Sequence, residues 1–118
     1  MHNSEEIISQ LKQSTDLDAM ALVAMAEAGS DLSKPHSPEF SFQTDFKAVA
    51  EAIENELSNL GYGIVIYEPD DEAPYFEIEA SCVMVLELEK LKNISAAFKA
   101  LAAKYRASYD GWGAEVVE

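Results

Sequence analysis

The amino-acid sequence predicts an α+β protein in which two helices cover one face of a four-stranded antiparallel sheet. Three observations predict this fold class. Apolar residues recur at helical spacing in two segments, one from Phe46 and one from Leu91. Short apolar or alternating segments, typical of strands, lie before, between and after them. The resulting order is β-α-β-β-α-β, which is the order of a ferredoxin-like sandwich.

The N-terminal residues 4–28 are predicted to be helical and to form an addition to this sandwich. Asn3 and Glu6 have the spacing of a capping box at the start of the helix. Residues 17–25 are apolar on most sides, which is typical of a helix that lies in a deep groove or packs against another chain. Gly29 is expected to end the helix in a left-handed cap.

The first strand and the helix after it follow a proline-containing loop. Residues 40–43 alternate between aromatic and polar side chains, which predicts a half-buried strand. Thr44 is predicted to cap the helix over residues 45–60. Gly61 is expected to end that helix.

Two strands joined by a charged hairpin loop are predicted next. Residues 64–67 are continuously apolar, which favours a central strand. Residues 68–74 form the loop, and residues 75–83 return as a strand. In that strand Glu77 and Glu79 alternate with apolar residues, so both carboxylates are expected on the sheet face that the helices leave open.

The last helix, over residues 91–105, leads into a final strand over residues 107–117. This strand contains the motif Tyr109-Asp110-Gly111-Trp112-Gly113, with the only tryptophan of the chain. Asp-Gly is a turn or bulge dipeptide, so the motif predicts a glycine-kinked strand that packs Trp112 against its neighbour. Tyrosine and tryptophan are also common interface anchors, and that second interpretation stays open.

Composition excludes several classes of function. The chain has 8 basic and 22 acidic residues and a formal charge of −14. This charge repels phosphates and anionic headgroups, so neither direct nucleic-acid binding nor membrane binding is expected. The single cysteine, Cys82, lies in an apolar run and is predicted to be an unreactive thiol. The acidic N-terminus resembles no signal peptide and no run has membrane-spanning length, which predicts a cytoplasmic protein.

Residues that could carry chemistry are few. His2 and His36 have no partner at ligand spacing, and the acidic loop over residues 68–72 lacks the spacing of a calcium loop. No metal or cofactor is therefore expected, and no catalytic motif is present. Glu77 and Glu79 could act as a paired acid and base, but solvated surface carboxylates are the favoured interpretation.

Two blocks of the sequence resemble the ribonuclease E inhibitor family, the regulators of ribonuclease activity B. The block LAAKYRASYDGWGAEVVE, residues 101–118, is similar to the C-terminal signature of the family. Residues 28–64 are similar to its Gly-x-Asp entry, aromatic strand and helix ending in Leu-Gly-Tyr. The resemblance implies the same ferredoxin-like sandwich and a small acidic protein that inhibits an endoribonuclease without touching the RNA.

The length of the chain predicts one domain over residues 1–118, with an N-terminal helical extension at 1–29 and a core at 30–118 that resembles the family. The expected function is non-enzymatic regulation of a ribonuclease E type endoribonuclease, bound through a basic region of that enzyme. The alternative is an oligomeric small-ligand-binding or general protein-interaction module that pairs with copies of itself. The expected partner-binding residues are Tyr109, Asp110, Trp112, Glu77 and Glu79, with Gly111 and Gly113 shaping the motif.

Overall fold

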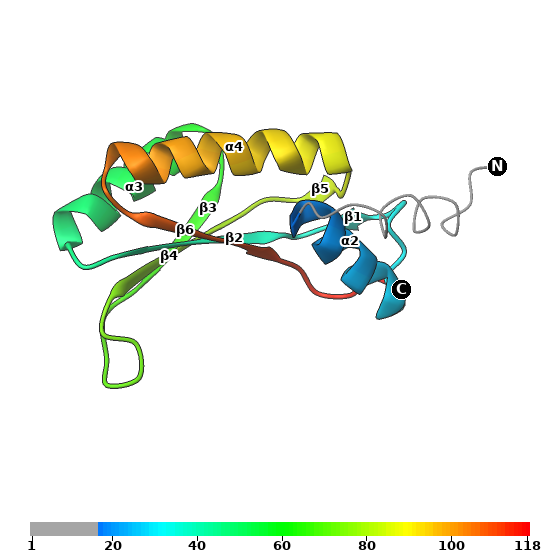
Figure 1. The fold of residues 1–118 in the computed structure, drawn as a ribbon, viewed down its shortest axis with the longest axis horizontal. Helices are drawn as coiled ribbons and strands as arrows, with labels where there is room; N and C mark the ends of the chain where they lie inside the picture. Colours follow the sequence, from blue (N-terminus) through cyan, green and yellow to red (C-terminus); the bar gives the residue numbers. More distant parts are fainter. Residues whose placement is uncertain (1–16) are drawn as a thin grey trace.

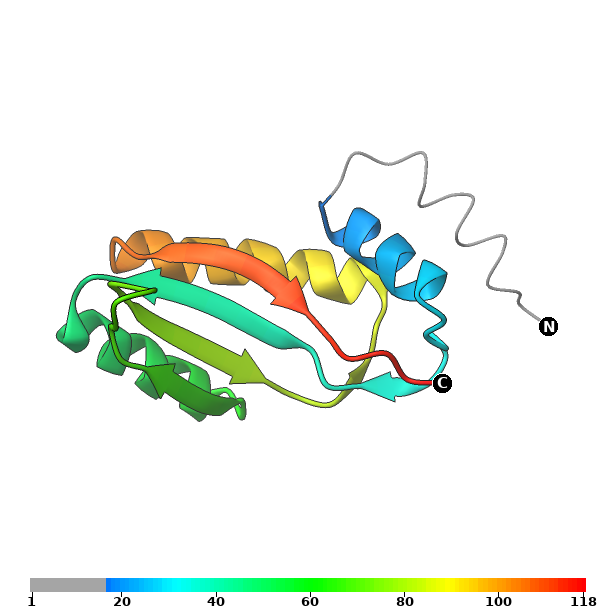
Figure 2. The ribbon, with the colours of Figure 1, turned by 90° about the horizontal axis from the view of Figure 1, so that it is seen from below.

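The computed structural model describes residues 17–118, and the capping box predicted at Asn3 lies outside them. Two helices cover one face of a four-stranded sheet, and a third helix lies at one end (Figures 1 and 2). The helices of the described residues are α2 (Leu17–Glu27), α3 (Lys47–Asn59) and α4 (Leu88–Lys104). The sheet strands are β2 (Glu39–Thr44), β3 (Gly63–Tyr67), β4 (Phe76–Ser81) and β6 (Ser108–Gly113). Strands β1 (Pro35–His36) and β5 (Met84–Val85) pair separately with each other.

The sheet topology confirms the predicted fold class. The strands lie in the order β3-β4-β2-β6, and every neighbouring pair is antiparallel. In chain order this is 2-3-1-4, the arrangement of a ferredoxin-like sandwich. Figure 2 shows the sheet in front of α3 and α4, so both helices lie on the same face. The predicted sequence order of strands and helices therefore holds, with β1 and β5 as additions that local patterning did not predict.

The hydrophobic core lies between the sheet and its two helices. Phe40 and Phe42 of β2 are fully buried, and the ring of Phe98 of α4 lies 5.2 Å from each of them. Leu57 of α3 and Ile78 of β4 are also fully buried in the same cluster. The central strand β2 thus packs its aromatic side chains against α4, and its neighbours fill the space beside them.

The prediction that residues 64–67 form a central strand is wrong, because β3 lies at an edge of the sheet. Ile64 and Ile66 face the helices, whereas Val65 and Tyr67 are 49% and 48% exposed. A continuous apolar run indicates burial on both sides only where both faces of a sheet are covered. Here one face is open, so half of the run reaches solvent.

The predicted cap of α3 is also wrong. The N-cap position is Phe46, and no side chain caps the helix there. Thr44 is still paired with Phe76 in the sheet, so the helix cannot begin until the chain has left β2. The Thr44 hydroxyl instead accepts the Phe46 N–H at 3.2 Å. Gly29 and Gly61 follow α2 and α3, as predicted.

The final strand contains the predicted bulge but is shorter than predicted. The β2–β6 register shifts where Ser41 pairs with Gly111 and Phe42 pairs with Tyr109, which leaves Asp110 as the extra residue. Gly111 has φ +98°, a conformation that glycine adopts at low cost. The strand ends at Gly113 instead of residue 117, although the Val117 carbonyl still accepts the Asp31 N–H at 2.6 Å.

None of the helices within residues 17–118 combines the length and the apolar character needed to cross a lipid bilayer.

The bulge yields a test with a matched control. Gly111→Ala should lower the free energy of unfolding by about 1 to 2 kcal/mol, because a Cβ is strained at positive φ. Gly113 has no positive φ and no atom within 4 Å of an added Cβ. Gly113→Ala should therefore change the free energy of unfolding by less than about 0.5 kcal/mol. Urea melts of both variants measure the difference, and equal costs would contradict the role assigned to Gly111.

Candidate functional site

The bulge divides the side chains of the motif between the two faces of the sheet. Trp112 pairs with Phe40 and Tyr109 pairs with Phe42, so both aromatic rings face the helices. Asp110 turns to the open face, where its Oδ2 accepts the Gln43 amide at 3.1 Å. The five expected partner-binding residues are therefore not on one surface.

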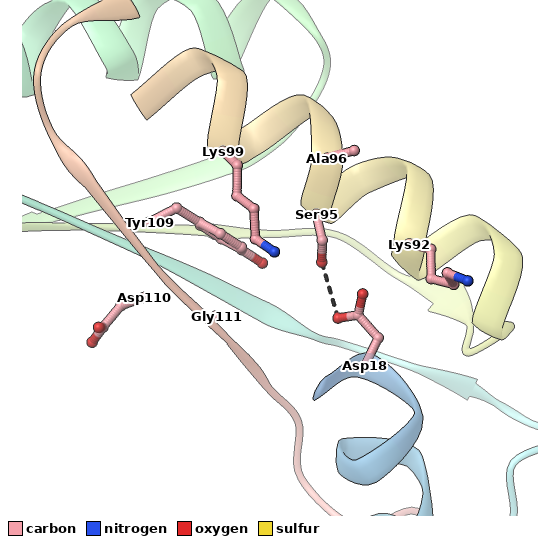
Figure 3. Close-up of a pocket in the computed structure, with 8 residues that line it drawn as sticks. All are labelled: Asp18, Lys92, Ser95, Ala96, Lys99, Tyr109, Asp110 and Gly111. Carbon is pink, nitrogen blue, oxygen red and sulfur yellow. Dashed lines mark hydrogen bonds between the residues drawn. The ribbon is translucent and has the colours of Figure 1, made fainter. Parts of the chain in front are cut away.

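Trp112 joins the last strand to the first described helix. Its indole Nε1–H donates to Oδ1 of Asp18 in α2 at 2.9 Å. The Ser95 hydroxyl of α4 donates to the same oxygen, also at 2.9 Å (Figure 3). Asp18 is only 9% exposed and Ser95 only 5%. One buried carboxylate thus holds three elements together through charge-assisted hydrogen bonds.

A cavity of about 550 Å³ lies between α2, α4 and β6. We call it the motif cavity, because the backbone of the motif forms one wall. Its lining residues are Asp18, Lys92, Ser95, Ala96, Lys99, Tyr109, Asp110 and Gly111 (Figure 3). Its volume lies in the range of small-molecule sites.

Tyr109 forms the inner wall of the motif cavity. Its ring lies 5.2 Å from that of Phe42 and 5.8 Å from that of Phe98. Burial raises the pKa of the Tyr109 phenol to about 12, and the nearby Ser95 hydroxyl opposes part of that rise. The phenol oxygen is buried and has no hydrogen-bond partner among residues 17–118. The phenol thus remains protonated at neutral pH with its donor unused.

The second candidate surface is the face of the sheet that α3 and α4 leave uncovered, which we call the open face. Strand pairing sets its side chains in rows. Tyr67, Glu77 and Gln43 form one row across β3, β4 and β2, and Val65, Glu79 and Ser41 form the next. Asp110 extends the first row through its bond to Gln43. Glu77 and Glu79 therefore lie on this face, as their alternation predicted.

Carboxylates crowd one another on the open face. Burial raises the pKa of the Glu79 carboxyl, and a hydrogen bond to Glu39 and the charges of Glu39 and Glu77 raise it further. No ion pair joins these three glutamates to a basic residue within the described chain. Strands β2, β3, β4 and β6 contain no lysine or arginine. The open face is thus purely acidic.

The acidic residues that could act in catalysis do not line a common pocket among those described. Asp110 lines the motif cavity together with α4, whereas Glu77 and Glu79 line none of the hollows described. A carboxylate pair that transfers protons must meet the same substrate within hydrogen-bond reach. Glu77 and Glu79 are close to each other on β4, but none of the described hollows would hold a substrate against them.

The sequence did not predict a buried pair formed by Ser30 and His36. Ser30 Oγ lies 2.5 Å from His36 Nε2, and His36 Nδ1 donates to the Lys34 carbonyl at 2.8 Å. Ser30 Oγ also accepts the Val117 N–H at 2.9 Å. Both side chains are buried, His36 to 1% exposure. The pair binds the C-terminal segment to the loop after α2, which is a structural role.

Neither Cys82 nor the acidic hairpin loop shows features of a reactive site. Burial raises the pKa of the Cys82 thiol, which disfavours the nucleophilic thiolate. In the loop, Asp70 Oδ1 accepts the backbone N–H groups of Glu72 and Ala73 and so stabilises the turn. Between residues 17 and 118, no three histidine, cysteine or carboxylate side chains converge as metal ligands would.

Comparisons with known proteins place these surfaces in context. A family profile described as "Regulator of ribonuclease activity B" matches residues 15–114. The chain is also similar to a curated protein of Pseudoalteromonas atlantica named "Regulator of ribonuclease activity B". The two are 29% identical over 98 residues, which cover 80% of this chain and 84% of that protein. Residues 15–114, the region that the family profile matches, include α2, the four-stranded sheet and the motif.

The contacts that Asp18 makes with Ser95 and Trp112, which we call the Asp18 junction, predict that the two aspartates of the motif cavity contribute unequally to the free energy of unfolding. Asp18→Ala leaves the half-buried Trp112 donor and the buried Ser95 donor without their acceptor and should cost about 2 kcal/mol of unfolding free energy. Asp110→Ala loses one exposed hydrogen bond and should cost less than about 0.5 kcal/mol. Denaturant melts of the two variants test this. Similar costs would show that Asp18 does not hold α2 to the core.

The crowding of carboxylates at Glu79 predicts that removing its charge raises the stability of the protein, by an amount that depends on pH. Because its folded-state pKa is raised above the usual 4.5, the folded protein holds this proton more tightly than the unfolded chain does. Stability therefore falls as the pH rises through the window above 4.5. Glu79→Gln should gain on the order of 0.5 kcal/mol at neutral pH, and the gain should vanish as the pH falls through that window.

Glu72→Gln is the control for this effect, since Glu72 is exposed in the hairpin loop. Its unfolding free energy should match that of the parent protein at each pH. A gain for Glu79→Gln that does not change with pH would contradict the electrostatic explanation.

Proposed function

The chain belongs to the regulator of ribonuclease activity B family, and we propose that it regulates a ribonuclease by binding that enzyme through the open face. In its finer form, the proposal makes the chain a non-enzymatic cytoplasmic inhibitor of a ribonuclease E type endoribonuclease. The similarity of residues 28–64 and 101–118 to that inhibitor family supports this target. The absence of Glu77 and Glu79, the candidate acid and base, from the described hollows supports a binding role over a catalytic one.

The charge of the open face is the observation that carries the proposal. Its charged side chains, Glu39, Glu77, Glu79 and Asp110, are all acidic, whereas four lysines lie on α4 in the opposite layer. Bringing like charges together on one surface has an unfavourable free energy unless a cation offsets it. A basic segment of a protein partner would supply that cation, and the guanidinium of arginine matches carboxylate geometry best.

Apolar groups on the same face fit a protein partner better than a simple ion. Val65 and Tyr67 are each about half exposed on the edge strand, next to Glu79 and Glu77. A tyrosine ring can be the apolar anchor of an interface and can also stack with an arginine side chain. RNA, in contrast, would meet four carboxylates and a net charge of −14. Inhibition is thus proposed to act through the enzyme and not through its substrate.

Binding to purified ribonuclease E tests the proposal. In the triple variant Glu39→Gln, Glu77→Gln, Glu79→Gln, affinity should fall on the order of 10-fold, mainly through slower association. Binding of the parent protein should weaken as salt rises, because the Debye length shortens to about 10 Å at 0.1 M. Surface-plasmon-resonance kinetics at several salt concentrations measure both effects.

A control variant with the same net charge separates the open face from charge alone. Glu51→Gln, Glu72→Gln and Glu89→Gln remove three exposed carboxylates from α3, the hairpin loop and α4. This variant should bind within about 2-fold of the parent protein, since only the long-range field has changed. Equal losses in the two triple variants would overturn the assignment of the open face. Binding of the chain to RNA alone would overturn inhibition through the enzyme.

A further inference from the structure

We infer that the motif cavity is a binding site for the carboxylate group of a small ligand. This site lies on the helix side of β6 and is separate from the open face, so the inference does not rest on the proposed function. The groups that would recognise the carboxylate are the Tyr109 phenol and the Lys99 ammonium group, from β6 and α4.

The Tyr109 phenol is a hydrogen-bond donor that the fold leaves unused. Its oxygen is buried in the cavity wall without a partner among the described residues. Buried polar groups in native proteins nearly always have a partner, either in the protein or in an ordered water, and a ligand oxygen can take the place of that water. The aromatic rings of Phe42 and Phe98 fix the position of the ring, so the donor is held in place.

Lys99 supplies the positive charge. Its side chain extends from α4 toward the Tyr109 hydroxyl in Figure 3, and both residues line the same cavity. Lys34, Lys90 and Lys104 each form an ion pair with a carboxylate, whereas no ion pair within residues 17–118 engages Lys99. An ammonium group and a phenol facing one cavity can each donate to one oxygen of a single carboxylate.

The two aspartates of the cavity do not oppose such a ligand as strongly as their number suggests. The Asp110 carboxylate points away from the cavity in Figure 3 and accepts the Gln43 amide on the other face of the sheet. Asp18 faces inward, but two short hydrogen bonds from Ser95 and Trp112 stabilise its charge. Lys92 adds a second ammonium group to the lining. The charges at the cavity are thus locally balanced, unlike those of the chain as a whole.

The donor set fits a carboxylate better than a phosphate. The Ser95 hydrogen is already donated to Asp18, which leaves the phenol and the ammonium groups of Lys99 and Lys92 at the cavity. The net charge of −14 repels a phosphate dianion more strongly than a singly charged carboxylate. The cavity volume of about 550 Å³ exceeds that of one carboxylate. A ligand body the size of a short dicarboxylate or an amino-acid side chain therefore fits.

Amide NMR shifts of the full chain, titrated with glutarate, test the inference. Glutarate should shift the amides of Ser95, Tyr109 and Gly111 saturably, and the uncharged isostere glutaramide should not. Tyr109→Phe and Lys99→Gln should each weaken glutarate binding about 10-fold, as expected for one hydrogen bond to a charged group. Lys90→Gln, on the same helix outside the cavity, should bind glutarate like the parent protein.

A second arm distinguishes a free small molecule from an acidic peptide side chain. The probe is an acetylated and amidated Gly-Glu-Gly peptide. Stronger binding of this peptide than of glutarate would assign the cavity to a glutamate side chain, with the same carboxylate recognition. No saturable shift with either probe, equal binding of glutaramide, or equal affinity in all variants would overturn the inference. Because Tyr109→Phe keeps the packed ring, its loss of binding would not reflect unfolding. None of these outcomes bears on the proposal that a ribonuclease binds at the open face, which the triple variants test separately.

Discussion

One-sided coverage of the sheet is the constraint on which the rest of this structure depends. Two helices pack on one face, so every strand must send alternate side chains into the core and alternate side chains to solvent. The buried set is apolar and includes Phe40, Phe42 and Ile78. The exposed set carries the carboxylates. The same alternation therefore produces both a core that stabilises the fold and an acidic surface without basic residues.

The motif requires one departure from this alternation. In a regular strand, Tyr109 and Trp112 would point to opposite faces because they are three residues apart. The extra residue at Asp110 resets the phase, so both rings face the helices and the carboxylate faces out. The glycine at 111 makes the bulge conformation accessible, with φ +98°. Trp112 can then reach Asp18, and Tyr109 can complete the wall of the motif cavity.

Local patterning was sufficient for the element order, the bulge and the exposure of Glu77 and Glu79, because all of these depend on neighbours in sequence. It failed where the outcome depends on distant partners. The position of β3 at an edge follows from the strand order, and Thr44 loses its capping role because Phe76 keeps it in the sheet. The hydrogen bonds of Asp18 join it to Ser95, which is 77 positions away along the chain, and to Trp112, which is 94 positions away. No local signal in the sequence marks Asp18 as a buried acceptor.

The two proposed sites share one residue but need not influence each other. Asp110 contributes backbone to the motif cavity and its carboxylate to the open face. Energetic coupling between two sites requires an element with two discrete arrangements that both ligands bias. Here the bulge is held by the Gln43 bond on one side and by ladder pairing on both flanks, and the ring of Tyr109 is fixed by Phe42 and Phe98. A rigid strand of this kind separates two binding surfaces, so a ligand in the cavity should leave the affinity of the open face unchanged.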